Sequence, residues 1–180
     1  NISEIIFDSR NDPMIKIIQN LNAGSLFIEN SRKLKCLIIN DDFIATKLQK
    51  IMDVEISECP NLKDINFFDN KLYNINKLLS MLDPTIITSI WLNKNNFDSS
   101  LVPFEKFTKV EELGLSENQF RGSLGLLVNL KNPKILVFSY IHINSGLEFL
   151  GMNLDQFYCS YNSVGYEVVK IQEKITEVYS

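Results

Sequence analysis

Apolar and polar residues follow one another in a recurring order along the middle of the chain. The segment beginning at Val110 has apolar residues at its first, fourth and sixth positions, and Asn118 and Phe120 follow. The segment beginning at Ile87 repeats the same order 23 residues earlier. Apolar residues two positions apart predict a short strand with one buried face. The asparagine follows where the chain must turn, and its amide can bond the backbones of neighbouring coils.

Further segments repeat this order, so the pattern predicts a repeat protein. Aligned on the motif, the units begin at Ile2, Leu34, Ile51, Leu62, Ile87, Val110, Pro133 and Leu154. The last four steps are 25, 23, 23 and 21 residues, whereas the first three are an irregular 32, 17 and 11. The asparagines that we expect to form a structural ladder between coils are Asn70, Asn95, Asn118 and Asn162. Asp42 and Cys59 take the asparagine place in the second and third units, and Ile141 breaks the ladder in the seventh.

The segments between the predicted strands follow a different pattern. After Phe97 and after Phe120, apolar residues recur at about every third position, which predicts 3₁₀ or loose helical turns. Residues 75–82 predict a short α-helix that ends before Pro84, and residues 14–21 predict a helical insertion. A strand that returns through a helical segment to a parallel strand winds right-handedly. The sequence therefore predicts an α/β fold, a curved right-handed solenoid with a parallel concave sheet and helical or 3₁₀ segments on its convex side.

The end of the chain has a third pattern. From Val168 to Val178, apolar residues are spaced by 3, 4 and 3 positions, which predicts a helix with one apolar seam. The helix either caps the last coil or begins a longer coiled coil that would join two chains. The predicted organisation is a repeat domain of about seven or eight units over residues 1–164, irregular before residue 62, and a capping or coiled-coil helix over residues 165–180.

The units at residues 87–124 resemble leucine-rich repeats, and the resemblance covers roughly residues 34–164. A second resemblance rests on four short stretches, which are residues 58–63 (Glu-Cys-Pro-Asn-Leu-Lys), 69–72 (Asp-Asn-Lys-Leu), 143–148 (Ile-Asn-Ser-Gly-Leu-Glu) and 157–160 (Phe-Tyr-Cys-Ser). In these stretches the chain resembles a leucine-rich-repeat group of arbuscular mycorrhizal fungi. That group implies an interaction scaffold, sometimes joined to a coiled coil or a kinase domain. The sequence contains no HRD, DFG or VAIK motif of a kinase.

Composition narrows the class of protein. A chain of 180 residues with 45% hydrophobic and 22% charged residues is long and apolar enough to fold as one domain. A net charge of −4 argues against binding to nucleic acid or an anionic membrane, and no apolar run approaches the roughly 20 residues that span a bilayer. Three widely spaced cysteines predict neither a disulfide framework nor a zinc site, and they favour a reduced, cytoplasmic location. The chain begins with Asn1 rather than methionine, so we expect a piece or a processed form of a longer protein.

Motifs of catalytic chemistry are missing from the sequence. It has no P-loop, GxSxG, HExxH or EF-hand pattern, and its single histidine, His142, has no acidic or cysteine neighbour in sequence. Glu111 and Glu112 occupy adjacent strand positions, which point to opposite sides of a sheet, so we predict that they do not face one ligand together. The sequence predicts a protein that is not an enzyme and needs no cofactor or metal ion.

The outward positions of the predicted concave sheet carry the most informative side chains. Trp91 lies between two buried positions and must point outward, and Gly114 on the next strand should leave a hollow beside the indole. Exposed aromatic residues typically anchor protein interfaces, and acidic residues at the rim favour a partner with basic residues. Alternatively, Trp91 and Phe68 cover each other across adjacent strands. The predicted partner-binding residues are Trp91, Phe68, Val137, Tyr158, Tyr140, Asp64, Glu112 and Gly114.

We therefore expect a protein–protein interaction module that binds a protein or peptide, with basic residues at its rim, on the concave face. Two other hypotheses stay open at this point. One is a regulatory domain cut from a larger protein such as a kinase. The other is a structural oligomer joined through the C-terminal helix.

Overall fold

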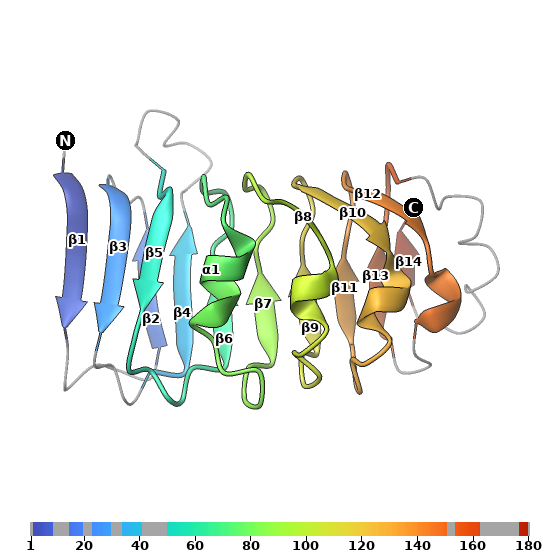
Figure 1. Ribbon diagram of the computed structural model, residues 1–180, viewed down its shortest axis with the longest axis horizontal. Helices are drawn as coiled ribbons and strands as arrows, with labels where there is room; N and C mark the ends of the chain where they lie inside the picture. Colours follow the sequence, from blue (N-terminus) through green and yellow to red (C-terminus); the bar gives the residue numbers. More distant parts are fainter. Residues whose placement is uncertain are drawn as a thin grey trace.

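The computed structural model describes residues 2–8, 15–19, 23–29, 34–40, 50–150, 154–162 and 177–179. Figure 1 shows two layers of elements stacked along one long axis, which the chain follows from one end to the other. One layer is a long parallel sheet, and the other consists of shorter strands, one α-helix and 3₁₀ turns. A single cluster of buried apolar residues draws members from both layers and forms the core.

The long sheet has eight parallel strands in the order β14-β13-β11-β9-β7-β6-β4-β2. They are β2 (Ile15–Gln19), β4 (Cys36–Asn40), β6 (Asp64–Asn66), β7 (Ser89–Trp91), β9 (Glu112–Gly114), β11 (Ile135–Val137), β13 (Gln156–Tyr158) and β14 (Glu177–Tyr179). First residues of neighbouring strands pair with one another, at steps of 21, 28, 25, 23, 23, 21 and 21 residues. The predicted solenoid with a parallel sheet is therefore confirmed, and one full coil separates each pair of neighbouring strands.

Alternate residues of the central strands are buried, as the period-two pattern predicts. In the coil of β7, Ile90 and Leu92 are fully buried, whereas Ser89 and Trp91 are half-buried on the solvent side. The equivalent buried pairs in neighbouring coils are Ile65 and Phe67, Leu113 and Leu115, Leu136 and Phe138, and Phe157 and Cys159. Removing these apolar faces from water is the main force that holds the two layers together.

The N-terminal part of the chain has a second sheet that the prediction did not contain. Its strands are β1 (Ile2–Asp8), β3 (Ala23–Glu29) and β5 (Asp53–Ile56), all parallel and in that order, and they lie in the second layer. The units predicted to begin at Ile2 and Ile51 are therefore wrong, because their strands do not belong to the long sheet.

The helical insertion predicted at residues 14–21 is wrong, because most of this segment is β2 of the long sheet. β2 pairs in parallel with β4 along its whole length. Its isoleucines, at positions 15, 17 and 18, are β-branched and favour a strand over a helix. With β2 in place, the irregular steps predicted before residue 62 are replaced by steps of 21 and 28 residues.

The second layer becomes helical in the middle and C-terminal coils, as predicted. The helix predicted at residues 75–82 is confirmed as α1 (Ile75–Ser80), and the predicted 3₁₀ turns are η1 (Val102–Phe104), η2 (Leu124–Leu127) and η3 (Leu147–Phe149). A third parallel sheet consists of β8 (Asp98–Ser100), β10 (Gln119–Ser123) and β12 (His142–Ser145). The ring of Phe120 packs against those of Phe97 and Phe104, with centroids 5.9 and 5.8 Å apart, so part of the core is aromatic.

α1 lies beside β5 and covers the edge of the three-stranded sheet (Figure 1). The Lys77 ammonium lies 2.7 Å from the carboxylate of Asp53 and 2.8 Å from that of Glu55, both on β5. The backbone N–H of Ile56 donates to the sulfur of Met81, just after the helix, at 3.2 Å. An uncovered strand edge exposes unpaired backbone groups, and α1 closes this one where the layer changes from strands to helical turns.

The C-terminal helix predicted over residues 165–180 is wrong for its last part, which forms β14. β14 pairs in parallel with β13, and Val178 stands opposite Phe157. The step of 21 residues equals the step before it, so this segment continues the coils and satisfies backbone groups at the edge of β13. Residues 163–176, and with them the predicted domain boundary at residue 165, lie outside the described residues.

Candidate functional site

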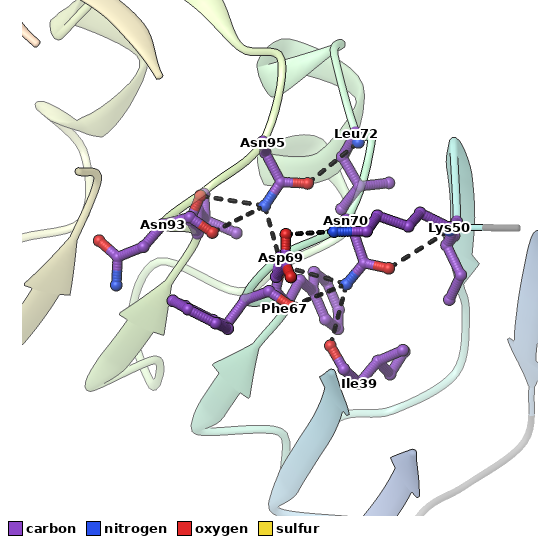
Figure 2. Close-up of polar contacts among 11 residues, drawn as sticks. Ile39, Lys50, Phe67, Asp69, Asn70, Leu72, Asn93 and Asn95 are labelled. Carbon is purple, nitrogen blue, oxygen red and sulfur yellow. Dashed lines mark hydrogen bonds and ion pairs between the residues drawn. The ribbon is translucent and has the colours of Figure 1, made fainter. Parts of the chain in front are cut away.

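A ladder of asparagine side chains joins neighbouring coils just beyond the strands of the long sheet (Figure 2). The Asn95 amide donates to Phe67 O of the preceding coil at 2.8 Å and to Leu92 O of its own coil at 3.0 Å. Its Oδ1 accepts the backbone N–H of Leu72 at 3.0 Å. The amide also donates to Asn93 O at 3.3 Å, so the side chain holds four backbone groups from two coils. The same set of bonds is made by Asn70, Asn118 and Asn162.

Other residues take the asparagine place in some coils. Ile141 stands there after β11 and is buried, so its side chain adds apolar contact and no hydrogen bond. Asp42 lies outside the described residues, and Cys59 follows β5 in the second sheet instead of standing in the ladder. An ion pair between Lys50 and Asp69 flanks the ladder beside Asn70 (Figure 2).

A second ladder runs along the open face, by which we mean the solvent face of the long sheet that was predicted to be concave. Asn93 Oδ1 accepts the N–H of Ser116 at 2.8 Å, and Ser116 Oγ accepts the N–H of Ser139 at 2.9 Å. Ser139 Oγ in turn accepts the N–H of Ser160 at 3.1 Å. Asn93 and Ser116 are buried although they occupy outward positions. These side chains are engaged in holding the sheet together at one border of the open face.

The remaining outward residues form two rows that cross the strands. One row is Cys36, Asp64, Ser89, Glu112, Ile135 and Gln156. The other row is Ile38, Asn66, Trp91, Gly114, Val137 and Tyr158. Neighbours within a row are about 4.8 Å apart, the spacing of paired strands. The rows therefore bring most of the predicted partner-binding residues onto one surface.

The Trp91 side chain lies across the neighbouring strand β9. A Cβ atom on Gly114 would come within 2.5 Å of Cε3 of the indole, so the glycine provides the space that the ring occupies. The indole N–H donates to Oε2 of Glu112 at 3.1 Å, and Ser89 Oγ donates to the same oxygen at 3.0 Å. The hollow predicted beside Gly114 is therefore wrong, because the indole itself fills it. The same contacts fix the orientation of the half-buried ring.

An open hollow of about 340 Å³ lies beside Trp91, and its lining residues come from the coils of β4, β6, β7 and β9. Cys36 and Asn66 contribute to its walls, and the predicted residues Trp91, Asp64 and Glu112 all line it. The indole therefore contributes to the wall of a real concavity, although not to the hollow at Gly114 that the sequence predicted.

Glu111 and Glu112 both line this hollow, so the prediction that they cannot face one ligand is wrong. Glu111 precedes β9, and strand alternation does not apply before the strand begins. The Glu111 carboxylate lies 2.6 Å from the Lys134 ammonium, and this hydrogen bond raises the pKa of Lys134. The charge of Glu111 is thus balanced within the protein.

The charges of Asp64 and Glu112 are not balanced in this way. Asp64 Oδ1 accepts the hydroxyl of Thr88 at 3.0 Å, and Glu112 accepts only neutral donors. Among the described residues, neither carboxylate has a lysine or arginine within ion-pair distance. Burial, and secondly the Asp64 charge, raise the pKa of the Cys36 thiol, so this thiol is neutral at pH 7. The hollow therefore carries net negative charge.

Phe68 and Tyr140 are the two predicted partner-binding residues that belong to neither row of the open face. The ring of Phe68 lies under the Lys94 ammonium, 5.5 Å from its centroid, and within the described chain it makes no ring contact with Trp91. Tyr140 stacks on Tyr161 with centroids 4.2 Å apart, and both stand on turns with positive φ beyond the strand ends. The alternative in which Trp91 and Phe68 cover each other is not the arrangement found here.

The described residues show no cluster of three histidine, cysteine or acidic side chains that could hold a metal ion. In the same part of the chain, no helix has both the length and the apolar character needed to cross a bilayer. Within these residues, Cys36, Cys59 and Cys159 form no disulfide bond.

No protein-family model matches the chain, and no curated protein matches it. Among solved structures, the internalin inlF of Listeria monocytogenes is similar, with a TM-score of 0.59 at 18% identity over 88% of this chain and 54% of the internalin. The leucine-rich-repeat ectodomain of the plant membrane receptor kinase GASSHO1/SCHENGEN3 from Arabidopsis thaliana, solved in complex with CASPARIAN STRIP INTEGRITY FACTOR 2, gives 0.53 at 14% identity over 88% and 27%. A leucine-rich-repeat protein of Leptospira interrogans gives 0.51 at 15% identity over 86% and 54%.

These similarities confirm the fold as a leucine-rich-repeat solenoid. The chain spans about half the length of the internalin. At such low identities the likeness concerns the fold alone, and the resemblance to the fungal group stays a prediction.

Proposed function

We propose that this chain is a non-enzymatic recognition module that binds a protein or peptide on the open face, with Trp91 at the centre of the contact. The observation that supports this proposal is an indole held in one orientation beside an open, negatively charged hollow. An aromatic side chain that is already fixed loses little entropy on binding, and such residues dominate the energetics of many interfaces. The fold adds support, because one similar domain was solved with a bound factor.

The row of outward residues that contains Trp91 indicates how long the contact with a partner can be. Trp91, Gly114, Val137 and Tyr158 stand in one row on four consecutive strands, so the row spans roughly 14 Å. A partner segment of about four extended residues covers that length. Asp64 and Glu112 on the flank favour a partner whose rim carries basic residues.

A regulatory module within a longer protein, such as a kinase, is a second candidate. The observation behind it is that the chain covers only 54% and 27% of two similar structures, the second of which is the ectodomain of a receptor kinase. The full-length open reading frame tests this candidate directly. The hypothesis of an oligomer joined through a C-terminal helix loses its basis, because residues 177–179 of the predicted helix form the strand β14.

The cytoplasmic location stays a proposal based on the three cysteines, which form no disulfide bond among the described residues. Imaging of a tagged full-length protein tests this location.

The test of the main proposal compares two alanine variants. Trp91→Ala removes the indole from the open face, and Val128→Ala removes a side chain that is 55% exposed on the other layer. Partners captured with the wild-type chain are purified, and their affinities for all three forms are measured by calorimetry. We expect Trp91→Ala to weaken binding by about 2 kcal/mol or more, roughly 30-fold, and Val128→Ala to leave it unchanged. A folded Trp91→Ala form with undiminished affinity would refute the proposal.

A further inference from the structure

We propose that the hollow beside Trp91 receives one arginine side chain of the partner. This inference rests on the proposed function and names the chemistry that the hollow recognises. The hollow has a volume of about 340 Å³, at the low end of the roughly 300–1,000 Å³ that is typical of ligand pockets. It is therefore suited to one long side chain rather than to a large ligand.

The carboxylates of the hollow have unused acceptor atoms. Glu112 accepts the donors of Trp91 and Ser89 with the same oxygen, Oε2. Asp64 accepts the Thr88 hydroxyl with Oδ1. Within the part of the chain that the structure describes, no hydrogen bond reaches Oε1 of Glu112 or Oδ2 of Asp64. Two carboxylates that form no ion pair among the described residues thus face a space that a cation can enter.

The arrangement of these groups favours a guanidinium over an ammonium. Asp64 on β6 and Glu112 on β9 stand in one row, two strand steps or roughly 10 Å apart at the backbone, with Ser89 between them. A guanidinium carries five N–H donors in one plane and can bond both carboxylates, whereas an ammonium is a compact point charge. A planar cation can also stack on an aromatic ring, and Trp91 is one of the residues that line the hollow.

The alternative occupants fit these groups less well. An apolar side chain would remove the two carboxylates from water without giving them a partner, which is costly. An acidic side chain would be repelled by Asp64 and Glu112. The neutral Cys36 thiol and Ile38 also line the hollow, and both suit the aliphatic stem of an arginine.

The test uses the indole N–H resonance of Trp91, which is unique because the chain has only one tryptophan. The whole chain is titrated with N-acetylarginine N-methylamide, with the matching lysine compound, and with the citrulline compound, which has the shape of arginine without its charge. We expect the arginine probe to shift the resonance saturably, with a dissociation constant on the order of millimolar for so small a ligand. The lysine probe should bind at least about tenfold more weakly, and the citrulline probe should cause no saturable shift.

Two variants test whether the carboxylates of the hollow are responsible. Glu112→Gln should weaken the arginine probe by at least about tenfold, because a charge-assisted hydrogen bond is lost. Asp98→Asn makes the same kind of change at an exposed ion pair with Arg121 on the third sheet, and it should leave binding unchanged. Equal binding of lysine or citrulline, or equal effects of the two variants, would overturn the inference.

The outcome also separates this inference from the proposed function. If the arginine probe does not bind while Trp91→Ala still weakens the partner, the arginine site is wrong and the recognition module stands. If the arginine probe does not bind and Trp91→Ala leaves the affinity of the partner unchanged, both proposals are wrong.

Discussion

Replacing Asn118 with leucine tests the ladder that sets the spacing of the coils. The variant leaves Leu92 O, Leu115 O and the N–H of Phe97 without bonds that are now 2.9, 3.0 and 3.1 Å long. The Asn118 side chain is buried, at 7% exposure, so water cannot easily replace it. A buried group that loses its partner costs about 1–3 kcal/mol, and a carbonyl oxygen that keeps another donor costs less. Counting the N–H of Phe97 and one carbonyl at the low end, we expect a loss of about 2–3 kcal/mol.

Urea unfolding followed by circular dichroism measures this loss as a change in the free energy of unfolding. The matched control is Asn96→Leu, which makes the same substitution at an exposed position. We expect the control to change stability by no more than about 0.5 kcal/mol. A loss below about 1 kcal/mol for Asn118→Leu, or equal losses for both variants, would refute the reasoning that the ladder joins the coils energetically.

Two further predictions concern buried positions. Gly114→Ala should destabilise the protein by about 1–3 kcal/mol and displace the indole from Glu112, because the new Cβ would collide with Cε3 of Trp91. An unchanged indole N–H resonance in this variant would contradict the prediction. Burial raises the pKa of the Cys159 thiol to about 11, so between its ordinary value and that pH the folded state holds a proton that the unfolded state releases. The free energy of unfolding should therefore fall from about pH 9 to pH 11, by at most about 2–3 kcal/mol, and Cys159→Ala should make the measured slope less steep.

The strands of the central coils could be predicted because their two faces differ in polarity. Ile90 and Leu92 are buried as the alternation requires, and the neighbouring coils repeat them at nearly constant steps. The layer of the N-terminal strands could not be predicted in this way. Val54 and Ile56 alternate with polar residues just as a strand of the long sheet does, and period two identifies a strand without naming the sheet it joins. The strand that contains Val54 and Ile56 is assigned to the second sheet by its pairing with β3.

The sequence predicted which residues of the candidate site face outward, and it did not predict how their side chains are arranged. Alternation places Trp91, Asp64 and Glu112 outward, and the same rule applied to Cys36 and Asn66 would have included more of the hollow's walls. The orientation of the indole was not accessible, because backbone periodicity fixes the direction of the Cα–Cβ bond and leaves the side-chain rotamer open. The rotamer decides which space the ring fills and which space it leaves open.

The most direct test of the central claim is acrylamide quenching of the only tryptophan in the chain, before and after saturation with a purified partner. Because Trp91 is half-buried on the open face, the free protein should show intermediate quenching. Binding on that face should reduce the quenching constant strongly, since the partner then covers the indole. An indole that is fully protected in the free protein, or one whose quenching is unaffected by a saturating partner, would contradict the account.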